Sequence, residues 1–314
     1  MRKLLLLTLL TLRLPALAFL NIYGLDSNGR VHYHEHHFLR SLEFNKDAII
    51  KSIRELQTDF AKKEYHFKQV SDYGAYLLMA GRFKDGLDIF RQLILKHPDQ
   101  YAIKANLAVA YELNGKLDSA LYWERQAVTI NPYAHDHSEW IHLQLLEAKI
   151  NYAKDPAWLE NNKVTYIADS LAKYDDGSEH PFKADQIFEH FIHQLNERLP
   201  FTLGEDPVLG KLLYELGDAY MKYSVYRSYY CYAMARYFNP ALATQVLSKF
   251  AGIKKVYKAK GITYKESINF KDREKYPPTD REVEAFLSKL KQRQQIYISN
   301  LPSLDISAIL SNMK

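Results

Sequence analysis

The chain has 314 residues, 47% of them hydrophobic, so it can bury a sizeable core as one long array or as two domains. Its formal net charge of +5 comes from two segments, +3 in residues 1–18 and +6 in residues 253–293, which leaves −4 on the remainder. This uneven distribution argues against the continuous basic stripe of a nucleic-acid-binding face, so we expect no nucleic-acid partner. The single cysteine, Cys231, excludes an intramolecular disulfide.

Residues 1–18 have the pattern of a signal peptide. Arg2 and Lys3 form the charged start, Leu4–Leu12 is apolar, and small residues precede a cleavage site after Ala18. A retained membrane anchor is the weaker alternative, because Arg13 interrupts a run that is already shorter than a spanning helix. We therefore expect an exported protein, periplasmic or secreted, with no transmembrane segment after cleavage and with an association with the cell envelope.

Residues 19–44 form a His-rich leader with the only strand signals in the chain. Asn28-Gly29 favours a tight turn and predicts a short β-hairpin of residues 20–26 with 30–36. On the second strand His32, His34 and His36 would share one face, about 7 Å apart, a spacing that suits zinc, copper or nickel. The alternative is a polar, exposed strand near a terminus, where histidine is merely tolerated.

Residues 45–66 predict an N-terminal capping helix. Asn45 or Asp47 can cap its start, and Ile49, Ile53 and Leu56 repeat at helical spacing. The segment lacks the small residues of the repeats that follow, so we expect it to cover the open end of the array.

A pattern with a period of 34 residues occupies residues 67–134. Gly81 recurs as Gly115 and Pro98 recurs as Pro132. The glycine turns the chain between two helices, and the proline ends the second one. The pattern predicts helices at about 67–81, 83–97, 101–115 and 117–131.

These residues resemble the tetratricopeptide-repeat family, whose period is 34. The resemblance is carried by Leu107-Ala108, Tyr111, Ala120, Ala127 and Pro132. It implies an all-α solenoid of helix-turn-helix repeats over residues 67–250, with helix A of each repeat lining a concave face.

Further helices are expected to continue the stack, since two repeats are too few for a stable array. Residues 138–152 have a broad apolar face, and Asp155-Pro156 opens a helix to about Lys173. A second Asp-Pro, Asp206-Pro207, opens a third repeat-like pair that ends near Pro240.

Tyrosines form a stripe in this third pair, at Tyr226, Tyr229, Tyr230 and Tyr237 around Ala233. Such a stripe is more typical of a core than of a ligand surface. The alternative is a glycan-binding groove that uses exposed tyrosines with Trp123 or Trp140.

Residues 251–314 predict a basic linker followed by a C-terminal helix. Thr279-x-x-Glu282 is a capping box that opens a helix to about Ser299, and the residues from Leu301 onward are expected to form a loose tail.

No nucleophile elbow, phosphate-binding glycine loop or zinc-helix motif occurs, so we expect neither an enzyme nor a cofactor. The predicted function is that of a scaffold or adaptor for a protein or an extended peptide. The predicted partner-binding positions are the helix A residues beside the packing stripe: Lys68, Ser71, Ala75, Asn106, Val109 and Glu112. Because of that position, we expect Asn106 and Glu112 not to matter for folding.

Overall fold

The computed structural model describes residues 20–23, 46–63, 65–167, 184–202, 204–260, 275–294 and 305–312. Over these residues the protein is all-helical and contains no strand. The α-helices are α1 (Lys46–Lys62), α2 (Phe67–Met79), α3 (Phe83–Lys96), α4 (Tyr101–Leu113), α5 (Leu117–Ile130), α6 (Ala134–His137), α7 (Glu139–Lys154), α8 (Trp158–Asn161), α10 (Ala184–Arg198), α11 (Pro207–Tyr220), α12 (Val225–Phe238), α13 (Ala243–Ala259), α15 (Asp280–Gln294) and α16 (Ile306–Ser311). Two short 3₁₀ turns, η3 (Leu199–Phe201) and η4 (Pro240–Leu242), follow α10 and α12.

Consecutive helices pack in pairs, α2 with α3, α4 with α5, and α11 with α12. The first two pairs repeat with the 34-residue offset seen in the sequence, since α4 begins at Tyr101 and α2 at Phe67. Gly81 and Gly115 connect the helices of these pairs with φ of 80° and 71°, a conformation that glycine adopts without steric cost. This arrangement fits an α-solenoid and confirms the four helix spans predicted there.

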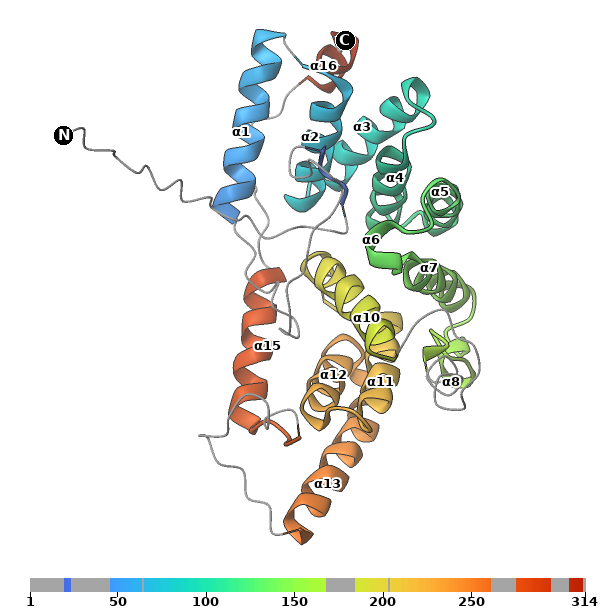
Figure 1. Ribbon diagram of the computed structural model, residues 1–314, viewed down its shortest axis with the longest axis vertical. Helices are drawn as coiled ribbons and strands as arrows, with labels where there is room; N and C mark the ends of the chain where they lie inside the picture. The colour runs from blue at the N-terminus through green and yellow to red at the C-terminus, as the bar shows by residue number, and fades with distance from the viewer. Residues whose placement is uncertain are drawn as a thin grey trace, which may run out of the picture.

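The helices form two lobes along the longest axis of the molecule (Figure 1). The N-terminal lobe consists of residues 20–23, α1–α5 and α16, and the C-terminal lobe of α7, α8, α10–α13 and α15. Each lobe has its own buried apolar core. The short helix α6 and helix α7 connect the two lobes along one side (Figure 1). Both lobes therefore meet around the α5–α7 connection.

Two predicted caps are present as side-chain hydrogen bonds. Asp206 accepts from the backbone amide of Leu209 at 3.0 Å and so starts α11 beside Pro207. Thr279 and Glu282 form the reciprocal capping box, with Glu282 accepting from the Thr279 amide at 2.8 Å and Thr279 accepting from the Glu282 amide at 3.2 Å. The start of α15 is confirmed.

The helix predicted from Asp155 to about Lys173 is wrong. Asp155 accepts a hydrogen bond from the Ala157 amide at 2.9 Å, and the helix that follows, α8, ends at Asn161. The backbone amides of Val164 and Thr165 then donate hydrogen bonds to the carboxylate of Glu215 instead of to helical carbonyl groups. A tertiary contact therefore replaces the local pattern.

The C-terminal tail is not loose throughout, because α16 returns to the N-terminal lobe (Figure 1). Ile309 and Leu310 are buried there. The Tyr65 hydroxyl donates to the carbonyl of Ile309 and the Lys96 ammonium to that of Leu310, both at 2.8 Å. The expected tail is thus wrong for residues 305–312, which cover one end of the lobe.

The predicted β-hairpin falls mostly on residues outside the described part of the chain. Of its two arms only residues 20–23 are described, and they form no strand. The three histidines of the predicted metal site, His32, His34 and His36, and residues 1–18 also lie outside the described residues.

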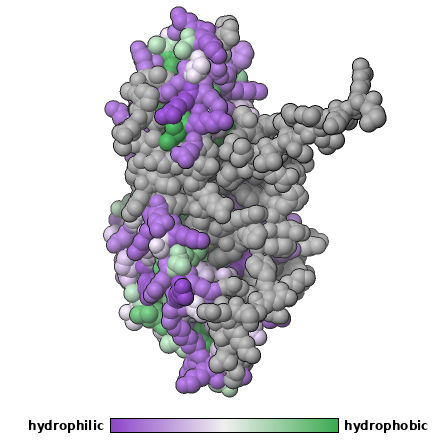
Figure 2. Space-filling view, turned by 90° about the vertical axis from the view of Figure 1, so that its left-hand side faces the viewer, coloured by the Kyte–Doolittle hydropathy of each residue, from purple (hydrophilic) through white to green (hydrophobic). Residues whose placement is uncertain are grey.

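The tyrosine stripe of α12 is core, as predicted. Tyr229, Tyr230 and Ala233 are buried, whereas Tyr226 and Tyr237 pack against them from partly exposed positions. The face in Figure 2 shows a described surface that is largely hydrophilic, with apolar side chains scattered over it. Among the described residues, no helix has the length and apolar character needed to cross a bilayer.

Candidate functional site

The face formed by α2 and α4 holds a segment of the chain's own backbone, residues 20–23. The carboxamide of Asn106 accepts from the backbone amide of Asn21 at 2.7 Å and donates to the Asn21 carbonyl at 2.8 Å. The carboxylate of Asp72 accepts from the Tyr23 amide at 2.6 Å. One side chain from each of two neighbouring helices therefore binds the main chain of this segment. We call this surface the α2/α4 face.

Side chains of the bound segment alternate between the core and the rim. Leu20 and Ile22 are buried in the N-terminal core. Tyr23 packs edge-on against Phe67, and the ammonium of Lys68 lies 5.4 Å from its ring centre. Burial, together with the Asp72 carboxylate, raises the pKa of Tyr23 to about 12. The segment is thus held by its backbone and by two apolar side chains.

The six predicted partner-binding residues all lie on α2 and α4, but only Lys68 is exposed. Ser71, Ala75 and Val109 are buried, Asn106 binds Asn21, and Glu112 contacts side chains of α7 and α10. The premise that Asn106 and Glu112 lie outside the packed part of α4 is wrong, because each is buried and hydrogen-bonded to a distant part of the chain.

A second polar site, largely buried, lies where α4, α5, α7, α10 and α11 converge. At its centre the carboxylate of Glu112 contacts three groups, His142 Nε2 at 2.9 Å, Lys149 Nζ at 3.1 Å, and the guanidinium of Arg198. Lys149 also reaches Asp206 at 2.7 Å. We call this set, together with Glu124 and Glu139, the buried charge cluster.

The other side of the His142 ring faces two carboxylates. Its Nδ1 lies 3.3 Å from Glu124 Oε2 and 3.8 Å from Glu139 Oε2. Glu139 is also contacted by His135 Nδ1 at 2.8 Å and by the Tyr101 hydroxyl at 3.1 Å. His135 reaches it from the α6 turn with a left-handed φ of 49°, a conformation that costs energy in a non-glycine residue.

Burial and charge act in opposite directions on this cluster. Burial would raise the pKa of Glu112, but Arg198, Lys149 and His142 outweigh it and hold that pKa well below its usual range. Burial would lower the pKa of His142, but Glu124 and the hydrogen-bonded carboxylates hold it well above the usual value. Glu112 is therefore a carboxylate surrounded by cations.

Glu124 and Glu139 are a like-charged pair in a dry environment. Burial and the neighbouring Glu139 charge raise the pKa of Glu124 to about 7. Burial acts on Glu139 too, but His135 and the hydrogen bonds it receives hold its pKa well below the usual range. Atom Oε1 of Glu124 has no hydrogen-bond partner among the described residues. Such a perturbed cluster is typical of functional sites and of structural ion networks alike.

Comparison with protein-family models, with curated proteins and with solved structures finds no match for this chain. The two polar sites must therefore be interpreted from their own geometry.

Sequence reasoning missed the buried charge cluster. The signal was Glu139-x-x-His142, whose two side chains share one face of α7 with apolar Ile141 and Leu145 nearby. His135 lies in the short α6 segment, and its ring contacts Glu139. His190 accepts from the indole of Trp140 at 3.2 Å with its Nδ1, so this pair is interior packing.

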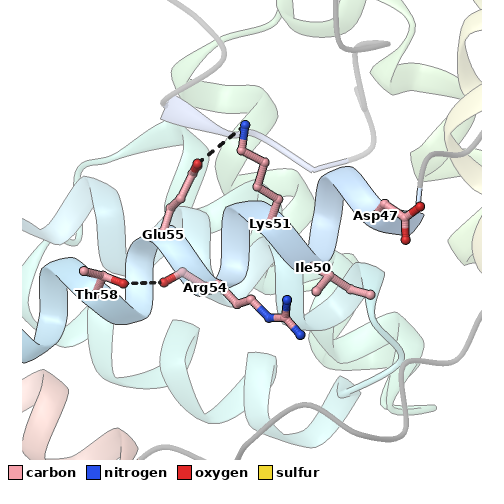
Figure 3. Close-up of a pocket in the computed structure, with 6 residues that line it drawn as sticks. All are labelled: Asp47, Ile50, Lys51, Arg54, Glu55 and Thr58. Carbon is pink, nitrogen blue, oxygen red and sulfur yellow. Dashed lines mark hydrogen bonds and ion pairs between the residues drawn. The ribbon is translucent and has the colours of Figure 1, made fainter.

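A shallow hollow on α1 is a weaker candidate. Figure 3 shows its six lining residues, all on this one helix: Asp47, Ile50, Lys51, Arg54, Glu55 and Thr58. Lys51 and Glu55 pair with each other at 3.8 Å, and the Thr58 hydroxyl donates to the Arg54 carbonyl at 2.9 Å. Five of these residues are exposed and none is buried, so the hollow offers no desolvated group for chemistry.

Proposed function

We propose that the protein is an exported, tetratricopeptide-like α-solenoid that acts as an adaptor by binding an extended segment of polypeptide on its concave α2/α4 face. The 34-residue period of the helix pairs and the positive-φ glycines between them support the repeat assignment. The observation that carries the function is the hold of Asn106 on both the amide and the carbonyl of Asn21.

The physical reason is that this contact recognises a main chain. A carboxamide offers one acceptor and a two-proton donor group, which match the N–H and C=O of a single residue irrespective of its side chain. Asp72 adds a second acceptor two residues further along, at Tyr23. Specificity is then supplied by the buried positions taken here by Leu20 and Ile22.

The chain's own segment thus shows the chemistry that a partner would need. A partner segment would be extended, with apolar side chains two residues apart and free backbone groups between them. It would bind by displacing residues 20–23 or by extending along α2 past Lys68, the exposed member of the predicted set.

Site-specific photo-crosslinking tests this proposal. A photo-reactive amino acid replaces Lys68 on the α2/α4 face, or, as the matched control, Tyr122, which is 57% exposed on α5. Cells are irradiated and adducts are identified by mass spectrometry. We expect a defined protein adduct from position 68 and none from position 122.

Two further conditions make the result specific. An excess of a synthetic peptide with the sequence of residues 19–26 is expected to compete with the adduct in the purified system, and Asn106→Ala is expected to reduce it several-fold. Equal labelling from both positions, or an adduct insensitive to the peptide, would contradict peptide binding on this face.

Export is tested separately by the mature N-terminus. Mass spectrometry of the protein from an envelope fraction is expected to find a chain beginning at Phe19, one residue before the buried Leu20. A chain that retains Met1 in that fraction would contradict cleavage after Ala18.

A further inference from the structure

The buried charge cluster contains a group of ligand atoms with the geometry of a metal site. One oxygen of Glu124, one oxygen of Glu139 and one ring nitrogen of His142 lie within 4.8 Å of one another. All three residues are buried, at 1%, 3% and 2% exposure. None belongs to the α2/α4 face or to the His-rich leader.

The separations fit coordination of a small cation. Zinc binds His nitrogen and Glu oxygen at about 2.0–2.2 Å, so two ligands of a tetrahedral site lie about 3.3–3.6 Å apart. His142 Nδ1 is 3.3 Å from Glu124 Oε2 and 3.8 Å from Glu139 Oε2. These two separations lie within a few tenths of an ångström of that spacing, and all three ligand atoms lie within 4.8 Å of one another.

The orientation of the imidazole is set from its other side. Nε2 of His142 lies 2.9 Å from Glu112, whose carboxylate is held in place by Lys149 and Arg198. A carboxylate that accepts the Nε2 proton directs Nδ1 towards the ligand position and makes it a better donor, as outer carboxylates do in metal sites. Glu139 and His142 are also three residues apart on one helix face, the spacing by which helical bundles present metal ligands.

The charge of the cluster agrees with a divalent ion. To bind an ion through Nδ1, His142 gives up one proton, and Lys149 and Arg198 then face four carboxylates: Glu112, Glu124, Glu139 and Asp206. One divalent ion would balance the two carboxylates in excess. The buried Oε1 of Glu124, without a hydrogen-bond partner among the described residues, marks where the compensation is incomplete.

We propose that Glu124, Glu139 and His142 bind one divalent transition-metal ion, with Zn²⁺ the best fit, and that the ion joins α5 to α7 at the connection between the lobes. Its role is structural, because the ligands are buried and lie outside the α2/α4 face.

Native mass spectrometry of the untagged full-length protein tests the site. The protein is produced in zinc-supplemented medium and washed with a chelator to strip exposed histidines. We expect about one Zn²⁺ per wild-type chain, and at least tenfold lower occupancy in Glu124→Gln, which keeps the side-chain shape but removes an anionic ligand. Glu147→Gln, an exposed change on α7, is expected to keep the ion.

Either of two results would overturn the proposal: a folded wild-type protein without zinc, or equal zinc occupancy in the wild-type protein and Glu124→Gln. Bound protons would then balance the charge of the cluster. A measurement that needs no variant guards against a substitution that fails to fold. In the cobalt-substituted wild-type protein we expect the visible bands of four- or five-coordinate Co²⁺. The weak spectrum of six-coordinate aqueous Co²⁺ would count against the site.

Discussion

Two buried polar side chains of helix α4 point in different directions and have different neighbours. Asn106, near the middle, presents a carboxamide that binds the backbone of residues 20–23. Glu112, six residues later, is covered by α7 and α10 and bound to His142, Lys149 and Arg198. Both were predicted as partner-binding residues of one continuous surface.

The difference shows that the elements packed against α4 limit how far the α2/α4 face extends. Where the neighbour of α4 is a short segment without regular helix, as at residues 20–23, another segment can replace it. Where the neighbours are whole helices carrying charges, the polar side chain becomes part of the core. The length of the usable surface is therefore set by the neighbours of α4 and cannot be read from its repeat pattern alone.

The largest effect is expected from Glu112→Ala. It would leave the buried guanidinium of Arg198 without its carboxylate and remove the same carboxylate from His142 and Lys149, so the free energy of unfolding should fall by about 3–5 kcal/mol. Urea unfolding followed by circular dichroism measures this. The exposed pair of Glu147 with Arg125 serves as the control, since Glu147→Ala should cost about 1 kcal/mol or less. Similar losses in both variants would mean that the contacts of Glu112 are worth no more than a surface ion pair.

Ala120→Leu tests the crossing of α5 with α4, the helix that carries Asn106 and Glu112. Ala120 of α5 is fully buried against α4, and a larger side chain there should lower stability by about 1–3 kcal/mol through overpacking. Thr129→Leu, at an exposed position of the same helix, should change stability little. Unchanged thermal unfolding of Ala120→Leu would mean that the crossing tolerates extra volume.

Glu215→Gln tests a carboxylate that accepts hydrogen bonds from backbone amides, whereas Glu112 contacts cationic side chains. Burial raises the pKa of Glu215 to about 7, against the opposing effect of hydrogen bonds from the Val164 and Thr165 amides. Since its folded pKa lies above its unfolded pKa, the wild-type protein loses stability as pH rises from about 4.5 to about 7.

The glutamine variant lacks this loss. The unfolding free energy of Glu215→Gln minus that of the wild-type protein should therefore increase by about 1–2 kcal/mol as pH rises from about 4.5 to about 7. Melting curves at pH 4.5, 6 and 8 measure the change. A constant difference across pH would show that Glu215 titrates normally.

Asn106→Ala should have the smallest effect on global stability. It removes two hydrogen bonds to Asn21, which together are worth about 1–2 kcal/mol, and they hold only the leader. Hydrogen exchange at residues 20–23 should become faster while exchange within α4 and α5 stays slow. Retained protection of the Asn21 amide would contradict the backbone contact.

The sequence predicted the repeat region closely and the tertiary polar contacts poorly. Glycine turns and apolar spacing are local properties, so α2 to α5 begin at the predicted residues and end within two residues of the predicted positions. The burial of Glu112 depends on Arg198, 86 residues away, and no local sequence pattern predicts that contact. The end of α8 likewise depends on Glu215, whose carboxylate accepts hydrogen bonds from the Val164 and Thr165 amides that a longer helix would have used.

The return of α16 to α1–α3 has a consequence for the order in which the protein is completed. Tyr65 and Ile309 are joined across 244 residues, so the part of the chain made first receives one of its last contacts from the part made last. A linear array would otherwise close progressively from its first repeat. Here the apolar end covered by Ile309 and Leu310 stays open until nearly the whole chain has emerged, and closing so long a loop is slow. During synthesis, that end of the first lobe is therefore the part of its core that is covered last.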